Sequence, residues 1–126
     1  MAGDKVMIVD DDEEFLEELQ DVLAAYGYEA ITVNDSTRAV AMASQLQPKI
    51  LLLDLTMDKL DGFQVAEKLK KLPKTRNIPI IAVTGFYPPQ GSLCFENHSE
   101  IKMILEKPID PVALITTIEK VVRERK

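Results

Sequence analysis

The stretch Ile50-Leu-Leu-Leu-Asp54 contains four consecutive apolar residues that lead directly into a carboxylate. A short run that is apolar on both faces is typical of a buried strand in a parallel sheet, because helices cover both faces of such a sheet. Four similar runs lie outward from it along the chain, at residues 5–9, 28–33, 79–83 and 101–105. The sequence therefore predicts five short strands, of which residues 50–54 form the third.

Helical segments alternate with these strands. Apolar residues recur at helical spacing over residues 12–26, 36–46 and 62–71, and Asp110-Pro111 is a typical start for a last helix. The helical pattern within residues 86–100 is poor, so we expect a short or irregular fourth helix there. Strands alternating with about five helices predict an α/β fold with a doubly wound parallel sheet. No linker or internal repeat is visible, so we expect one domain over residues 1–126.

The composition is ordinary for a globular protein, with 46% hydrophobic and 29% charged residues. A formal net charge of −6 argues against a basic surface that binds nucleic acid. The apolar runs are far shorter than a membrane span, and the N-terminus lacks the pattern of a signal peptide. Cys94 is the only cysteine, which excludes an intramolecular disulfide. We therefore expect a cytoplasmic protein that binds neither nucleic acid nor membranes.

Polar side chains follow four of the predicted strands. They are Asp10 and Asp11, Asp54, Thr84 and Lys107. Ligands of open parallel sheets bind beyond the carboxyl ends of the strands, so we expect these side chains to meet at one edge. Adjacent carboxylates resist ionising together, and a hard divalent cation such as Mg²⁺ relieves their repulsion. The sequence therefore predicts a magnesium site at this edge.

The same residues suit the transfer of a phosphoryl group. An aspartate carboxylate can attack phosphorus as a nucleophile and form an aspartyl phosphate. Because such a transfer depends on positioning and on cations, we expect Asp54 to be the nucleophile and Lys107 to assist the metal. The Thr84 hydroxyl could bind a third phosphoryl oxygen.

Each of these residues also has a purely structural interpretation. The acidic run at residues 10–14 can cap a helix, through Asp11 or Asp12, and Asp54 can be a turn residue. Thr84 and Lys107 can be an ordinary strand-end hydroxyl and a solvated cation. His98 lacks companion ligands, and Cys94 is expected to fill apolar space. The functional interpretation depends on four separate signals falling at four strand ends of the same edge.

These motifs resemble the receiver domains of two-component response regulators over nearly the whole chain. The matching motifs are Val9-Asp-Asp11, Leu52-Leu-Asp-Leu55 with Met57 and Asp61-Gly62, Val83-Thr-Gly85 and Lys107-Pro108. The resemblance implies a flavodoxin-like sheet of order 2-1-3-4-5 and a phosphoryl group received on Asp54. The donor would be a phosphohistidine on a sensor histidine kinase or a histidine phosphotransfer protein, and a conformational change would signal to a downstream protein. Such a domain takes part in its own phosphorylation and dephosphorylation without being a conventional turnover enzyme.

The resemblance also implies roles for individual residues. The magnesium ligands would be Asp10, Asp11, Asp54 and the backbone carbonyl of Thr56. Asp11 would bind the ion directly and Asp10 largely through water, while Thr84 and Lys107 would hold phosphoryl oxygens. The Lys107-Pro108 bond is often cis in this family. The fourth helix and the fifth strand would form the output face, and together with the fifth helix they could form a surface for homodimer formation.

Three departures from the family pattern concern the switching parts. Ile104 stands where an aromatic residue is usual, three positions before Lys107. Asp58-Lys59 replaces the usual proline and glycine of the loop after Met57, and residues 97–101 replace a glycine-alanine turn. Phe86, two residues beyond Thr84, is bulky and apolar, so we predict that it hinders water and prolongs the phosphorylated state. Thr56 occupies the corresponding position beyond Asp54.

Other functions stay open at this point. The altered switching residues favour an interaction module that works without phosphorylation on the same fold. Asp54-Leu-Thr56 is faintly similar to the nucleophile motif of haloacid-dehalogenase-like phosphatases, but the second aspartate of that motif is absent. Flavodoxin-like cofactor binding would need a phosphate-binding loop rich in threonine and glycine after the first strand, and the sequence has none there.

Overall fold

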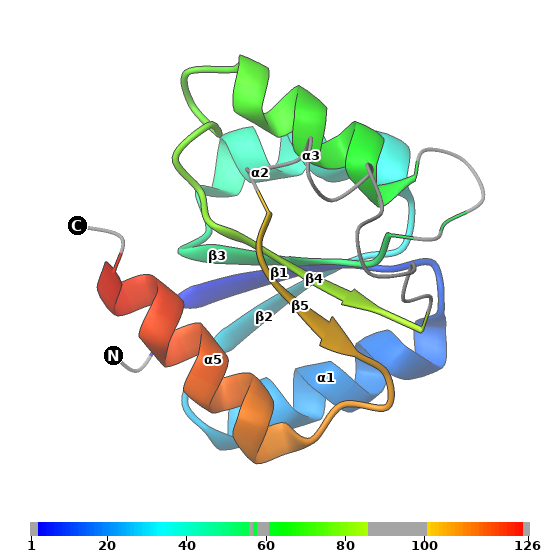
Figure 1. The fold of residues 1–126 in the computed structure, drawn as a ribbon, viewed down its shortest axis with the longest axis vertical. Coiled ribbons are helices and arrows are strands. Elements are labelled where there is room, and N and C mark those ends of the chain that lie inside the picture. The colour runs from blue at the N-terminus through cyan, green and yellow to red at the C-terminus, as the bar shows by residue number, and fades with distance from the viewer. Residues whose placement is uncertain (1–2, 56, 58–60, 86–100, 125–126) are drawn as a thin grey trace.

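The computed structural model describes residues 3–55, 57, 61–85 and 101–124. Within these ranges, five parallel strands form one sheet in the order β2-β1-β3-β4-β5, as predicted. The strands are β1 (Lys5–Val9), β2 (Glu29–Val33), β3 (Ile50–Leu53), β4 (Ile80–Thr84) and β5 (Ile101–Glu106). Because all five run the same way, their carboxyl ends lie at one edge of the sheet (Figure 1).

Helices cover both faces of this sheet. Helices α1 (Glu13–Ala25) and α5 (Pro111–Glu124) lie on one face, and α2 (Ala39–Leu46) and α3 (Gly62–Lys71) lie on the other (Figure 1). This arrangement confirms the predicted flavodoxin-like, doubly wound α/β fold. The predicted fourth helix falls in residues 86–100, outside the described residues. No helix in the described ranges has both the length and the apolar character to span a bilayer.

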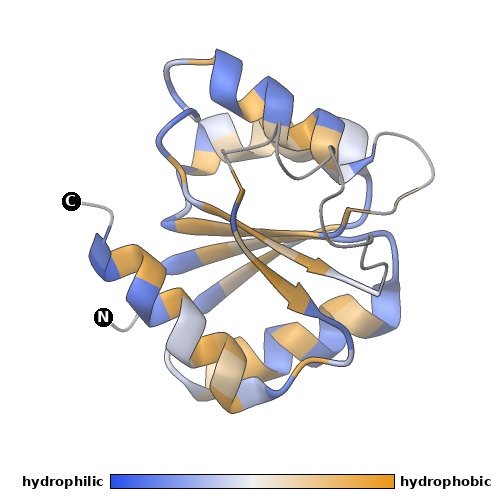
Figure 2. Ribbon diagram, viewed as in Figure 1, coloured by the Kyte–Doolittle hydropathy of each residue, from blue (hydrophilic) through white to orange (hydrophobic). Residues whose placement is uncertain are grey.

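The sheet separates two hydrophobic cores, because successive residues of a strand point to opposite faces. In β1, Val6 and Ile8 pack with α1 and α5, whereas Met7 and Val9 pack with α2 and α3. Every residue of β3 and β4 is buried. Figure 2 shows these central strands as apolar along most of their length, which explains why they read as continuous apolar runs.

The second helix begins later than its sequence pattern predicts. Residues 36–46 were expected to form one helix, but Ser36–Arg38 form a 3-10 turn and α2 starts at Ala39. The carboxylate of Asp35 accepts hydrogen bonds from the backbone N–H of Thr37 at 3.0 Å and from its hydroxyl at 2.7 Å. Asp35 is thus the N-cap of the 3-10 turn, and such turns are frequent at the amino ends of α-helices.

The edge strand β5 pairs irregularly with β4. Ile80 pairs with Ile101, but the next residue, Ile81, pairs with Met103, so that the ladder skips Lys102. In a regular strand, neighbouring side chains point to opposite faces. Here Lys102 and Met103 follow one another and are both exposed. The irregularity thus places a cation and a thioether together on the surface.

Candidate functional site

Three carboxylates meet at the carboxyl edge of the sheet. Asp10 follows β1 and Asp54 follows β3, and the Asp54 N–H donates to the carbonyl of Val9 at 3.0 Å. Asp10, Asp11 and Asp54 each place a carboxylate oxygen within 4.8 Å of the others. Asp10 and Asp54 are only 2% and 6% exposed, whereas Asp11 is exposed. The predicted convergence of these side chains is therefore present in the structure.

The carboxylates that follow β1 have two different roles: one caps helix α1 and the others belong to the carboxylate cluster. The Asp12 carboxylate caps α1, accepting from the N–H groups of Glu14 at 3.1 Å and Phe15 at 3.4 Å. The Asp10 carboxylate accepts from the Asp12 N–H at 2.9 Å, which bends the chain between strand and helix. The sequence predicts either Asp11 or Asp12 as the N-cap of α1, and in the structure Asp12 is the cap. Asp11 belongs to the carboxylate cluster.

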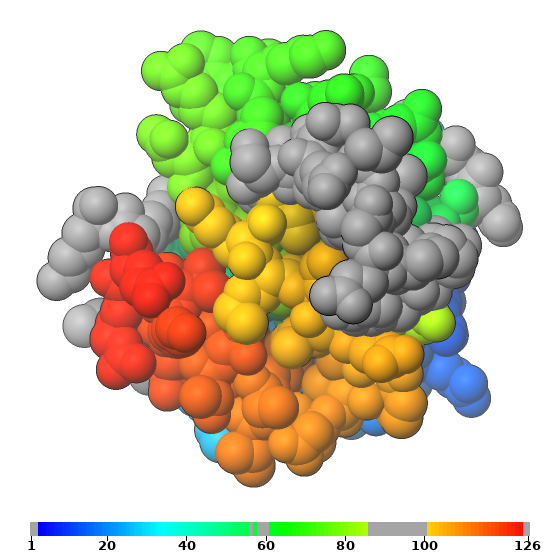
Figure 3. Space-filling view, in the orientation of Figure 1, coloured from blue at the N-terminus to red at the C-terminus, as the bar shows by residue number. Residues whose placement is uncertain are grey.

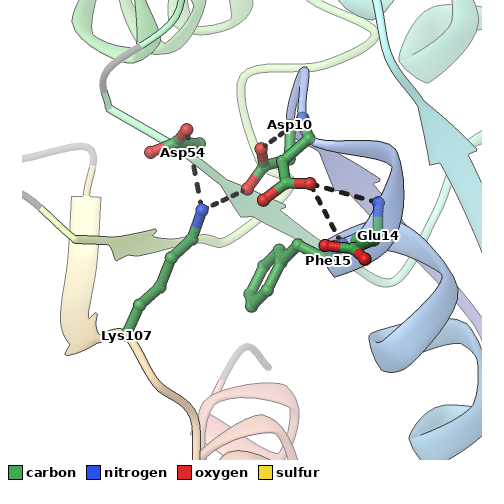
Figure 4. Close-up of polar contacts among 6 residues, drawn as sticks. Asp10, Glu14, Phe15, Asp54 and Lys107 are labelled. Carbon is green, nitrogen blue, oxygen red and sulfur yellow. Dashed lines mark hydrogen bonds and ion pairs between the residues drawn. The ribbon is translucent and has the colours of Figure 1, made fainter.

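Lys107 inserts its ammonium group between two of these carboxylates. Its Nζ lies 2.7 Å from Asp10 Oδ2 and 3.8 Å from Asp54 Oδ2 (Figure 4). The same atom lies 4.1 Å from the centroid of the Phe15 ring, a favourable cation–π contact. The sequence predicts Phe15 only as a core residue, because the apolar spacing of a helix does not indicate which ring will contact a lysine.

The electrostatics of the cluster favour an additional cation. Burial raises the pKa of Asp10 above its ordinary value of 3.8, because a low-dielectric surrounding disfavours the charged form. The hydrogen bonds from Lys107 and the Asp12 N–H and the charge of Lys107 act against this rise, and the charge of Asp11 adds to it. A divalent cation bound to these oxygens would lower the cost of keeping the carboxylates ionised.

The other predicted site residues lie at the ends of neighbouring strands. Thr84 ends β4 and is fully buried, and its carbonyl accepts from the Lys107 N–H at 2.9 Å. This backbone bond fixes the segment after β5 against the end of β4. The peptide bond between Lys107 and Pro108 is cis. Ile104, at the position where an aromatic residue is usual in receivers, is half-buried on β5.

A glycine brings α3 against the backbone of Asp54. A methyl group at Gly62 would overlap the carbonyl oxygen of Asp54 and lie 2.7 Å from the Leu55 Cα. The Gly62 N–H also donates to the Leu55 carbonyl at 3.1 Å. Asp61 caps the helix in a reciprocal capping box with Gln64. The Asp61-Gly62 pair noted in the sequence thus positions α3 close to the third strand.

Several predicted residues lie outside the described residues. They are Thr56, Asp58, Lys59, Phe86, Cys94 and His98. Thr56 was the expected source of a carbonyl ligand, and Phe86 was expected to slow the loss of phosphate. Both expectations remain predictions.

Comparison with known proteins agrees with this geometry. The family model described as the response regulator receiver domain matches residues 6–119. The chain is 37% identical over 119 residues to the response regulator PleD of Caulobacter vibrioides, covering 94% of this chain but only 26% of PleD. It is 32% identical over 114 residues to the polar-differentiation response regulator DivK of Brucella anthropi, covering 90% of this chain and 92% of DivK.

Solved structures show the same fold. The chemotaxis protein CheY4 of Vibrio cholerae superposes with a TM-score of 0.86 at 25% identity, over 95% of this chain and 99% of CheY4. The receiver domain of the sensor histidine kinase PA1611 of Pseudomonas aeruginosa superposes with a TM-score of 0.85 at 24% identity, over 96% of this chain and 98% of that domain. The latter structure carries a magnesium ion in its own active-site cleft. The family model matches most of this chain, and DivK is 32% identical to it over 92% of DivK's own length. This chain therefore belongs to the response regulator receiver domain family.

Proposed function

We propose that this receiver domain accepts a phosphoryl group on Asp54 in a Mg²⁺-dependent reaction and signals through the conformational change that follows. Receiver domains are signalling modules rather than conventional enzymes. The observation that carries the proposal is the meeting of three carboxylates with the Lys107 ammonium at the carboxyl edge of the sheet. Membership of the receiver family leaves the phosphatase and flavodoxin-like alternatives without support.

The donor atoms suit magnesium. Asp10, Asp11 and Asp54 offer carboxylate oxygens, which are the hard ligands that Mg²⁺ prefers, together with waters and substrate oxygens. The backbone carbonyl of Thr56 is proposed as a further ligand. When bound, the ion would supply positive charge to the carboxylates and to the incoming phosphoryl oxygens.

The residues of the chain have separate tasks in the proposed transfer. A carboxylate oxygen of Asp54 forms a bond to phosphorus while the bond between phosphorus and the histidine nitrogen of the donor breaks. Lys107 Nζ lies 3.8 Å from Asp54 Oδ2, so a short movement toward Asp54 would place it on a phosphoryl oxygen. Thr84 ends the adjacent strand β4, and its hydroxyl is the proposed partner of another phosphoryl oxygen.

The partners follow from this chemistry. We propose a sensor histidine kinase or a histidine phosphotransfer protein as the donor, and a downstream protein as the receiver of the signal. The relatives PleD and DivK are both response regulators. A cytoplasmic location, the absence of nucleic-acid binding and a homodimer through the fourth helix, β5 and α5 belong to the same proposal.

Intact-mass spectrometry with acetyl phosphate and Mg²⁺ tests the proposal. The wild-type protein should gain one phosphoryl group, Asp54→Asn should gain none, and EDTA should abolish the gain in the wild type. Asp21→Asn, an exposed aspartate within α1, is the matched control and should behave like the wild type. Equal phosphorylation of Asp54→Asn and the wild type would refute the assignment of Asp54.

A phosphorylation-independent interaction module is the second candidate. Ile104 favours it, because this half-buried residue replaces the aromatic side chain expected in a switching receiver. Binding of a downstream partner that is unchanged by Asp54→Asn would support this function over the first.

A further inference from the structure

A hollow of about 800 Å³ lies beside the amino ends of β4 and β5, at the edge of the sheet opposite the carboxylates. It is lined by the end of α3, by Arg76, Asn77 and Pro79 before β4, by the start of β5 and by the last turns of α5. Figure 3 shows part of its rim between the start of β5, in yellow, and the end of α5, in red. Sites for small molecules are typically about 300–1,000 Å³ in volume.

The lining of this hollow is positively charged. Its cations come from four separate segments and are Lys70, Arg76, Lys102 and Lys120, while Glu124 is the carboxylate among the lining residues. The whole chain has a formal net charge of −6, so this local excess of cations runs against the overall charge. Among the described residues, Arg76, Lys102 and Lys120 form no ion pair. Like charges gathered in this way attract anions.

One wall of the hollow is held by internal hydrogen bonds. The Lys70 ammonium donates to the carbonyl of Arg76 at 2.7 Å, which ties the end of α3 to the following turn. The hydroxyl of the buried Thr75 donates to the carbonyl of Leu69 at 2.6 Å, and the Arg76 N–H donates to the Leu72 carbonyl at 2.9 Å. The backbone of Arg76 is therefore held in an ordered turn, so that no ordering of this turn is needed when a ligand binds.

The opposite wall depends on the irregular pairing of β5. Because the ladder skips Lys102, both Lys102 and Met103 are exposed, and both line the hollow. Strand irregularities of this kind redirect side chains and are frequent beside binding sites. The skipped residue thus adds a cation and an apolar side chain to the same hollow.

We propose that this hollow binds a small organic phosphate of nucleotide size. The Arg76 guanidinium can bind two phosphate oxygens at once, and Lys102 and Lys120 can neutralise further charge. Met103, which is 36% exposed, offers apolar surface to the organic part of the ligand. The concave shape and the volume favour a small molecule over an acidic protein segment, which would suit a flatter surface.

Binding is tested by NMR on the ¹⁵N-labelled protein in EDTA, so that the carboxylate edge holds no metal. The probes are ADP, inorganic pyrophosphate and adenosine. ADP should shift the amide signals of Asn77, Lys102 and Met103 while leaving those of Asp10 and Asp54 in place. Pyrophosphate should act on the same amides more weakly than ADP, and adenosine should have little effect because it lacks phosphate.

Matched variants separate a site from a diffuse charge effect. Replacing Lys102 and Lys120 by glutamine should weaken ADP binding about tenfold or more, because two charged hydrogen bonds are lost. The control changes Lys68 and Lys74 to glutamine, removing the same charge from exposed lysines outside the hollow. The control should bind ADP like the wild type.

Other outcomes would overturn the proposal. The absence of shifts at millimolar ADP, or an equal loss of binding in the control variant, would exclude a built site. Pyrophosphate binding as tightly as ADP would exclude recognition of the organic part. Binding of a glutamate-rich peptide without binding of ADP would identify the hollow as a protein-binding surface instead.

Discussion

The two edges of the sheet carry opposite charges and are constructed differently. At the carboxyl edge, Asp10 and Asp54 are buried and the Lys107 ammonium lies between them. The opposite edge, where the strands begin, is called the amino edge below. There, Lys102 and Lys120 are exposed beside the hollow and form no ion pair within the described part of the chain. Buried charges need well-placed partners, since an unpaired one is costly, whereas exposed charges tolerate each other in water. The first edge is therefore suited to chemistry and the second to attracting an anion.

The largest expected effect comes from removing the cation of the carboxyl edge. In Lys107→Met, Asp10 Oδ2 loses a partner at 2.7 Å, and the proposed donor to the phosphoryl oxygen is removed. We expect phosphorylation of Asp54 at saturating Mg²⁺ to slow about 100-fold or more, as when one transition-state donor is removed. Unfolding in urea should show a stability loss of about 1–3 kcal/mol. A phosphorylation rate close to that of the wild type would show that Lys107 has no part in the transfer.

A pH effect should appear at the carboxyl edge. Burial raises the pKa of Asp10, so this carboxylate takes up a proton at a higher pH than an ordinary aspartate of pKa 3.8. Metal ligation needs the ionised form, so Mg²⁺ affinity should fall as pH drops through the raised pKa and recover above it. Mg²⁺ titrations followed by NMR at decreasing pH measure this. An affinity that stays constant until the pH is below 3.8 would contradict it.

A smaller effect is expected from the ring beneath Lys107. A cation–π contact contributes about 0.5–2 kcal/mol, so Phe15→Leu should slow phosphorylation by a few-fold. Phe15→Tyr keeps an aromatic face and should retain most of the rate. Time courses of intact mass with acetyl phosphate compare the two variants. If both variants lose the same activity, packing rather than the ring face is responsible.

The smallest effect should follow from neutralising the amino edge. Lys102 lies near the start of β5 and Lys107 directly follows its end, a separation of roughly 16 Å at about 3.3 Å per residue. This distance exceeds the screening length of about 8 Å at physiological salt. Replacing Lys102 and Lys120 by glutamine should therefore leave the phosphorylation rate of Asp54 almost unchanged. A marked change in this rate at physiological salt would show that the two edges are electrostatically coupled.

The carboxyl edge could be predicted from the sequence, because each of its side chains directly follows an apolar run that can be recognised on its own. Runs such as residues 50–53 are buried on both faces, and a parallel sheet brings the residues that follow such strands to one side. The pattern of strands alone therefore places Asp10, Asp54 and Lys107 together, as their contacts confirm. Thr84 falls at the end of β4 by the same reasoning.

The amino edge and the finer contacts could not be predicted. The skipped pairing at Lys102 depends on the register with β4, which no pattern within β5 reveals. The contact between Phe15 and Lys107 joins distant segments whose approach is set by the packing of α1. The late start of α2 could not be predicted because the apolar spacing of residues 36–46 does not distinguish the 3-10 turn Ser36–Arg38 from a turn of α-helix.

The close packing of Gly62 has a mechanical consequence. With no room for a methyl group between Gly62 and the Asp54 backbone, a movement of that backbone toward α3 would push against the first turn of the helix. The helix is ten residues long, and near its far end Lys70 holds the carbonyl of Arg76. Helix α3 therefore connects the two regions directly, with the proposed phosphoacceptor Asp54 packed against its first turn and the rim of the basic hollow at its other end.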